Sequence, residues 1–93
     1  MSDCLALHVR VYGLVQGVYY RDFTCRQARR LSLIGWVRNL PDGTVEAVAE
    51  GNRELLLEFL SALKNGPPRA RVDNIVEEWR QSAGIFSDFL ITG

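Results

Sequence analysis

Residues 5–21 read Leu-Ala-Leu-His-Val-Arg-Val-Tyr-Gly-Leu-Val-Gln-Gly-Val-Tyr-Tyr-Arg, and the hydrophobic period changes within this stretch. Leucine and valine alternate with other residues from Leu5 to Tyr12, which is the pattern of a half-buried strand. After Gly17 the residues predicted to face the core recur every three or four positions, as in an amphipathic helix: Tyr20, Thr24, Ala28 and Leu31. The sequence therefore predicts a strand and a helix joined by a loop that two glycines bracket.

A β-hairpin is predicted next along the chain. The stretch 33–39 is rich in β-forming residues, and Pro41-Asp42-Gly43 has the composition of a tight turn. Proline presets φ, aspartate can bond its own backbone, and glycine accepts a positive φ. The stretch 44–51 places apolar residues on one face (Val45, Ala47 and Ala49) and glutamates on the other (Glu46 and Glu50), so it completes the hairpin.

A second helix and two further strands follow the hairpin. Asn52 is a good N-cap, an apolar stripe runs from Leu56 to Leu63, and residues 65–68 (Asn-Gly-Pro-Pro) end the helix. The stretch 72–79 predicts a strand with room for a bulge around Val76, where the alternation is imperfect. Residues 88–92 predict a short last strand.

The resulting order is β-α-β-β-α-β plus a terminal strand. Two amphipathic helices can each bury their stripe only if they share one face of a common sheet. This order is typical of the ferredoxin-like, split βαβ arrangement, an α+β sandwich with an antiparallel sheet and both helices on one side. The length of 93 residues predicts a single domain over 1–93.

Composition narrows the range of partners. The chain has 11 Lys+Arg and 11 Asp+Glu, so its formal net charge is zero, which argues against nucleic acid or an anionic membrane as the partner. No stretch approaches the roughly 18 apolar residues of a membrane span, and no secretory signal pattern opens the chain, so we expect a cytoplasmic protein. Cys4 and Cys25 are expected to be free thiols, and a zinc site is not expected because His8 is the only histidine.

The loop from Gly13 to Arg21 has the arrangement of an anion site. A glycine-bracketed turn at the start of a helix can direct successive backbone N–H groups at a ligand, and the helix end adds its own free donors. Arg21, in the first helical turn, would close such a socket with a guanidinium. On spacing alone, glycines at such a junction more often serve only to relieve steric strain in a tight turn. The loop is neither a Walker motif nor a dinucleotide fingerprint.

Asn39 is the other candidate, because it ends a predicted strand beside the hairpin turn. Asparagine in this place usually bonds local backbone. Alternatively, its carboxamide could hold a water molecule with one donor and one acceptor on a rigid strand.

Taken together, these segments resemble the acylphosphatase family of small hydrolases. The similarity rests on G-x-V-Q-G-V-x-x-R at Gly13–Arg21 and G-W-V-x-N-x-x-D-G-x-V-E at Gly35–Glu46, with further matches near residue 70 and at Phe89 and Ile91. The resemblance implies that Arg21 clamps the phosphoryl group and that Asn39 positions the attacking water. It further implies a phosphate cradle of backbone amides from six consecutive residues: Val15, Gln16, Gly17, Val18, Tyr19 and Tyr20.

Three residues depart from the family pattern. Phenylalanine is common where Tyr20 stands, a basic residue where Leu14 stands, and glycine where Ser32 follows the first helix. A buried Tyr20 would need a hydrogen-bond partner for its hydroxyl, and Ser32 is expected to weaken the helix C-cap. Neither proposed catalytic residue is altered.

The resemblance implies hydrolysis of small acyl phosphates to a carboxylate and phosphate, without a cofactor or metal. The carboxylate leaves without a general acid, because its conjugate acid has a pKa of about 4–5. We expect a monomer. An RNA-recognition module shares the element order, but the stretch 44–51 lacks the aromatic residues that such modules use. The other alternative is a non-catalytic acylphosphatase-like regulatory domain; because the chain ends just after its last strand, we expect a free-standing enzyme.

Overall fold

The computed structural model of this protein describes residues 4–93 and has the predicted order of helices and strands. The elements are β1 (Leu5–Leu14), α1 (Tyr20–Arg30), β2 (Ile34–Asn39), β3 (Val45–Gly51), α2 (Arg53–Asn65), β4 (Arg71–Gln81) and β5 (Phe89–Ile91). The predicted cap of the second helix is confirmed, since the Asn52 side chain accepts a hydrogen bond from the Leu55 N–H at 2.9 Å.

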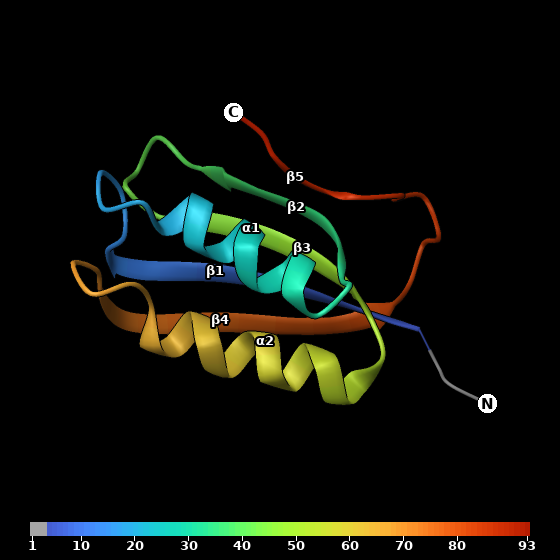
Figure 1. Ribbon diagram of the computed structural model, residues 1–93. Coiled ribbons are helices and arrows are strands. Elements are labelled where there is room, and N and C mark those ends of the chain that lie inside the picture. Colours follow the sequence, from blue (N-terminus) through green and yellow to red (C-terminus); the bar gives the residue numbers. More distant parts are fainter. Residues whose placement is uncertain (1–3) are drawn as a thin grey trace.

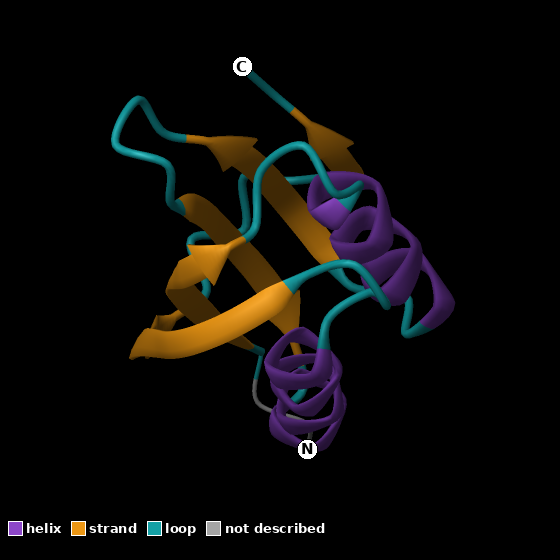
Figure 2. Cartoon of the chain, turned by 90° about the vertical axis from the view of Figure 1, so that its left-hand side faces the viewer, coloured by secondary structure: helices purple, strands orange, loops and turns teal. Residues whose placement is uncertain are grey.

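The strands form one sheet in the order β4-β1-β3-β2-β5, and both helices cover the same face of it (Figures 1 and 2). This confirms the predicted two-layer α+β arrangement. Pairing is antiparallel between β1 and β3, β1 and β4, and β2 and β3, whereas β5 runs parallel to β2. The parallel pairing follows from the long connection after β4, which crosses the end of the sheet before β5 begins.

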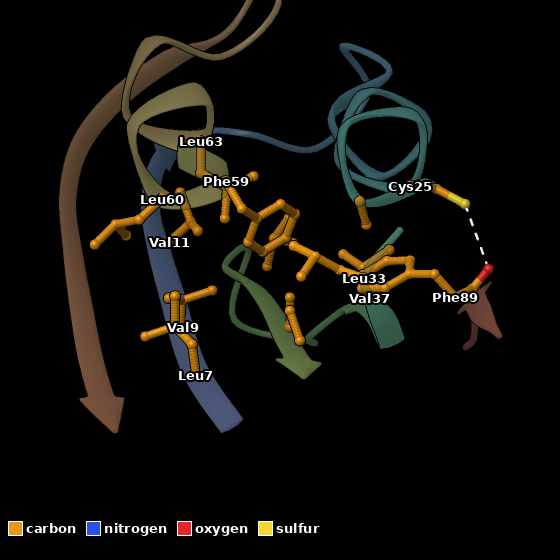
Figure 3. Packing of buried hydrophobic residues seen from close by; sticks show 14 of the residues in the cluster. Leu7, Val9, Val11, Cys25, Leu33, Val37, Phe59, Leu60, Leu63 and Phe89 are labelled. Atoms are coloured by element: carbon orange, nitrogen blue, oxygen red, sulfur yellow. Dashed lines mark hydrogen bonds between the residues drawn. The ribbon is translucent and has the colours of Figure 1, made fainter. Parts of the chain in front are cut away.

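The core lies between the sheet and the two helices (Figure 3). The inward-facing residues of β1, among them Leu7, Val9 and Val11, are fully buried. From α2, Phe59 packs with its ring edge-on to Phe89 of β5, with 6.1 Å between ring centroids. The predicted apolar stripes of both helices are buried as expected, so the hydrophobic periods identified the core correctly.

The bulge in β4 lies elsewhere than the sequence indicated. The β1–β4 register is continuous at Val76 and shifts between Tyr12 and Gly13, where Asp73 is the additional residue of β4. Gly13 has φ of 132°, and a Cβ there would overlap the carbonyl oxygen of Arg71. Glycine therefore allows β4 to approach β1 at the bulge, and β1 continues to Leu14, beyond its predicted end.

Ser32 occupies the left-handed position that ends α1, with φ of 56°. Its N–H donates to Arg29 O at 3.1 Å, and the N–H of Leu33 donates to Ala28 O at 2.8 Å. These two bonds form a Schellman motif, in which glycine is the favoured residue at the left-handed position. The helix C-cap is therefore complete, although serine adopts a conformation that L-residues disfavour.

Candidate functional site

The loop between β1 and α1 lies at the same end of the molecule as the β2–β3 turn (Figure 1). Gly17 and Tyr19 both have left-handed backbone conformations, with φ of 76° and 63°. Left-handed residues interspersed in a loop turn neighbouring peptide groups toward one side, which is the geometry of an anion-binding nest. Tyr19 is also the N-cap of α1, so the loop leads directly into the positive end of the helix dipole.

The backbone donors of this loop are unpaired within the protein. Within residues 4–93, none of the N–H groups from Val15 to Tyr20 donates a hydrogen bond to another protein group, and no side chain caps α1. The loop amides are therefore available to an external acceptor, as an anion cradle requires.

Arg21 and Asn39 lie on the same cavity, of about 390 Å³. Arg21 is in the first turn of α1 and Asn39 is the last residue of β2. The cavity is also lined by Val15, Gly17, Tyr19, Tyr20, Asp22 and Ile91. The fold therefore brings together four of the six predicted cradle residues with both predicted catalytic side chains, while Gln16 and Val18 are not among the lining residues.

The carboxamide of Asn39 has an unsatisfied acceptor. Its Oδ1 atom is buried and has no hydrogen-bond partner within residues 4–93. A buried acceptor without a partner costs about 1–3 kcal/mol. This is the opposite of the local backbone bonding that the sequence left open, because no backbone donor within residues 4–93 bonds to Oδ1.

The guanidinium of Arg21 is held by the last residue of the chain. Its NH1 group donates to the carbonyl oxygen of Gly93 at 3.2 Å, and this contact is exposed. Asp22, the acidic residue on the cavity, is paired with Arg26 at 3.0 Å across one helical turn. The Arg26 charge therefore offsets the Asp22 carboxylate, so the cavity retains positive character from Arg21 and the loop amides.

The side chain of Gln16 makes two hydrogen bonds that the sequence did not predict. Its Nε2 group donates to Leu40 O at 2.8 Å and to Thr44 O at 2.9 Å. These bonds tie the β1–α1 loop to the hairpin turn that follows Asn39. The turn itself is fixed by Asp42, whose pKa is lowered by hydrogen bonds from the side chain and backbone of Thr44 and by its pairing with Arg10.

Tyr20 anchors the start of α1 to the end of α2. Its buried hydroxyl donates to Leu63 O at 2.7 Å, which confirms that this departure from the family pattern needs a partner. Leu63 O has no partner within α2, because the residue four positions later is Pro67, which has no N–H. Burial of the hydroxyl raises the pKa of Tyr20 far above its usual value of 10.0, so it remains a donor.

His8 and Cys25, two other reactive side chains that the sequence analysis named, make contacts outside the cavity. His8 lies at 2.7 Å from Glu46 on the sheet face opposite the helices, and Cys25 is a buried free thiol. Burial raises the pKa of Glu46, but hydrogen bonds from His8 and Arg38 outweigh this and lower it overall. No group of three or more potential metal-ligating side chains is found within residues 4–93. Nor does that part of the chain contain a helix long and apolar enough to cross a membrane.

The chain is a small α+β protein in which a loop with unpaired amides, Arg21 and Asn39 all border one cavity. The acylphosphatase family model matches residues 7–91. An acylphosphatase of Dehalococcoides mccartyi strain CBDB1 is 51% identical over 86 residues, which cover 91% of this chain and 94% of the relative. The chain belongs to the acylphosphatase family.

Solved structures agree with this assignment. The crystal structure of acylphosphatase from Bacillus subtilis has a TM-score of 0.93 and 38% identity, and the match covers 96% of this chain and 99% of that one. The crystal structure of T. kodakarensis HypF matches with a TM-score of 0.83 and 36% identity, covering 96% of this chain but 12% of that one. The same fold therefore also occurs as a small part of a longer protein.

Proposed function

We propose that this protein, as one domain over residues 1–93, hydrolyses the carboxyl–phosphate bond of small acyl phosphates. Arg21 and the backbone amides from Val15 to Tyr20 hold the phosphoryl oxygens, and Asn39 positions the attacking water. The observation that supports this most directly is that Asn39, whose Oδ1 has no partner among the described residues, lines the same cavity as Arg21 and the loop.

The proposed reaction needs few groups. Phosphoryl transfer has a loose transition state with charge on the equatorial oxygens, so the protein chiefly positions and stabilises. Water attacks phosphorus in line with the bridging oxygen, the phosphorus–oxygen bond breaks, and the carboxylate leaves with the bonding electrons. We assign the proton of the attacking water to a phosphoryl oxygen, so no general base from the protein is required.

The central test compares two variants with matched controls. Arg21→Ala should lower kcat/KM for acetyl phosphate by roughly a hundredfold or more, since a donor to the transition-state charge is lost. Asn39→Ala should lower kcat by a similar factor and leave the affinity for inorganic phosphate largely intact. The controls are Arg80→Ala and Asn74→Ala, which truncate the same residue types on β4. Normal turnover in Asn39→Ala would remove this residue from the mechanism.

Arg21→Lys separates charge from geometry. A lysine keeps the positive charge but loses the planar pair of donors that fits two phosphoryl oxygens. We expect this variant to recover little of the activity lost in Arg21→Ala. Isothermal titration should show that inorganic phosphate binds the wild type most tightly and that Arg21→Lys binds it little better than Arg21→Ala. Undiminished affinity in Arg21→Ala would contradict the proposed clamp.

The similarity to part of HypF gives a second candidate, a domain without its own catalysis within a larger assembly. Release of phosphate from acetyl or benzoyl phosphate by the purified chain decides between the two. We further propose that the enzyme is a cytoplasmic monomer that works without metal. Sedimentation equilibrium should give a mass near 10.5 kDa, and turnover should survive dialysis against EDTA.

A further inference from the structure

A second cavity, of about 270 Å³, adjoins the proposed phosphate site. Five residues line it, and we call it the proline groove: Val18, Tyr19, Pro67, Pro68 and Arg69. Tyr19 lines both the proline groove and the phosphate cavity, so the two spaces are neighbours at this residue. The groove is formed by one isopropyl group (Val18), two pyrrolidine rings (Pro67 and Pro68) and one aromatic ring (Tyr19), with Arg69 as its charged member.

The two walls of the groove are fixed relative to each other. One wall comes from the loop that enters α1, and the other comes from the segment that follows α2. The hydrogen bond from the Tyr20 hydroxyl to Leu63 O joins the adjacent helix ends. The second wall is itself a turn, closed by the Ala70 N–H donating to Pro67 O at 3.0 Å, with Pro68 at the position where proline is favoured. The groove is therefore preformed.

Tyr19 is an unusual residue for its position. Its backbone is left-handed, with φ of 63° and ψ of 26°, which is unfavourable for a bulky residue that is not glycine. The residue is 77% exposed, so packing within the protein compensates for little of this strain. Strain retained at an exposed residue beside a site is often linked to function. The nest geometry accounts for the backbone conformation, and a surface for the substrate would account for a large aromatic side chain left exposed there.

We propose that the proline groove binds the acyl group of the substrate, so that the enzyme favours acyl phosphates with an apolar or aromatic acyl group. This inference rests on the proposed function. When the phosphoryl group lies in the cradle, the acyl substituent extends beyond it, and Tyr19 marks the adjoining apolar surface. A groove of about 270 Å³ can accommodate a phenyl ring, because cavities of about 150 Å³ bind benzene. Arg69 disfavours acyl groups that carry a positive charge.

The test measures kcat/KM for acetyl, butyryl, hexanoyl and benzoyl phosphate. In the wild type, kcat/KM should increase with alkyl length by up to about fourfold for each methylene buried. The informative quantity is the ratio of kcat/KM for benzoyl phosphate to that for acetyl phosphate. Dividing the ratio of each variant by that of the wild type cancels the difference in intrinsic reactivity between the two substrates.

Two variants and one control carry out this comparison. Tyr19→Asn keeps a residue that tolerates the left-handed conformation, and it should lower the ratio about tenfold. Pro68→Ala removes part of the other wall and should lower the ratio about threefold. The control, Ile85→Asn, replaces an apolar side chain that is 74% exposed in the β4–β5 connection, at the opposite end of the molecule (Figure 1). Its ratio should equal that of the wild type.

The outcomes separate this inference from the proposed function. If both variants leave the ratio unchanged, or lower turnover of both substrates equally, the acyl group does not bind in the proline groove, while the proposed function stands. If the wild type hydrolyses neither substrate, the proposed function itself is refuted, and this inference with it. Circular dichroism checks that each variant is folded; if Tyr19→Asn is not, Pro68→Ala decides.

Discussion

The hydrogen bonds from Gln16 to the β2–β3 turn give the sharpest prediction for catalysis. Gln16→Met keeps the length of the side chain and removes the Nε2 donor that binds Leu40 O and Thr44 O. Each carbonyl retains a second donor, because Leu40 O accepts from Gly43 N at 3.1 Å and Thr44 O accepts from Leu40 N at 2.9 Å. No acceptor is left unsatisfied, so the cost is two hydrogen bonds, about 1–3 kcal/mol in the free energy of unfolding.

The effect on turnover should exceed the effect on binding. Gln16 links the β1–α1 loop, which is proposed to hold the phosphoryl group, to the turn beside Asn39. Without this link, the proposed water is no longer held in line with the phosphorus atom. Displacements of about 1 Å can cost about a hundredfold in rate. We expect kcat to fall roughly ten- to a hundredfold, whereas the affinity for inorganic phosphate should change less than about threefold, because the cradle and Arg21 lie on the same side of the broken link.

Urea denaturation, steady-state kinetics with acetyl phosphate and titration with inorganic phosphate measure the three quantities. Gln81→Met is the matched control, because Gln81 is exposed at the far end of β4 and makes none of the side-chain hydrogen bonds found within residues 4–93. A Gln16→Met variant that loses the expected stability but keeps wild-type kcat would show that the link is structural only. An equal loss in kcat and phosphate affinity would place Gln16 in binding rather than positioning.

Three further predictions concern stability and are measured by urea denaturation. Tyr20→Phe should cost about 1–3 kcal/mol, because the buried carbonyl of Leu63 loses its donor; an unchanged midpoint would argue against this bond. Ser32→Gly should stabilise by about 1 kcal/mol, because glycine relieves the left-handed strain at the end of α1; destabilisation would contradict that reasoning. The lowered pKa of Glu46 means that its carboxylate stabilises the fold above its ordinary pKa of 4.5 and that this contribution disappears as the pH falls through the folded value. The stability difference between wild type and Glu46→Gln should therefore shrink from pH 7 to pH 3, and a constant difference would refute the linkage.

Local sequence patterns were sufficient to predict the order of helices and strands and the residues of the core. The alternation in β1 and the three-to-four spacing in both helices identify buried residues directly, since they depend on which face a residue occupies. The Asn52 cap was predictable for the same reason, because the bond to Leu55 spans three residues. The position of the bulge in β4 was not predictable from local sequence. Val76 disturbs the alternation because it is apolar and exposed, whereas the additional residue of β4 is Asp73.

The site was predictable where a short motif defines it and not where distant segments meet. Arg21 and Asn39 stand in recognisable motifs, and the fold brings them onto one cavity. The side chain of Gln16 bonds to the carbonyls of Leu40 and Thr44, which are 24 and 28 residues away, so no local sequence pattern predicts these bonds. Likewise, the sequence indicated that a buried Tyr20 hydroxyl needs a hydrogen-bond acceptor. That acceptor, Leu63 O, is identified only by the packing of α1 against α2.

The strand order leaves β4 at one border of the sheet and β5 at the other. Five of the eleven residues in β4 are charged, and Asp73 interrupts its regular pairing; β5 has only three residues. Unprotected borders invite strands from other molecules to add on, and charge, irregularity and shortness are the features that discourage such addition. Both borders are therefore poor templates for fibril growth. For this reason the folded protein is expected to resist intermolecular strand pairing at high concentration.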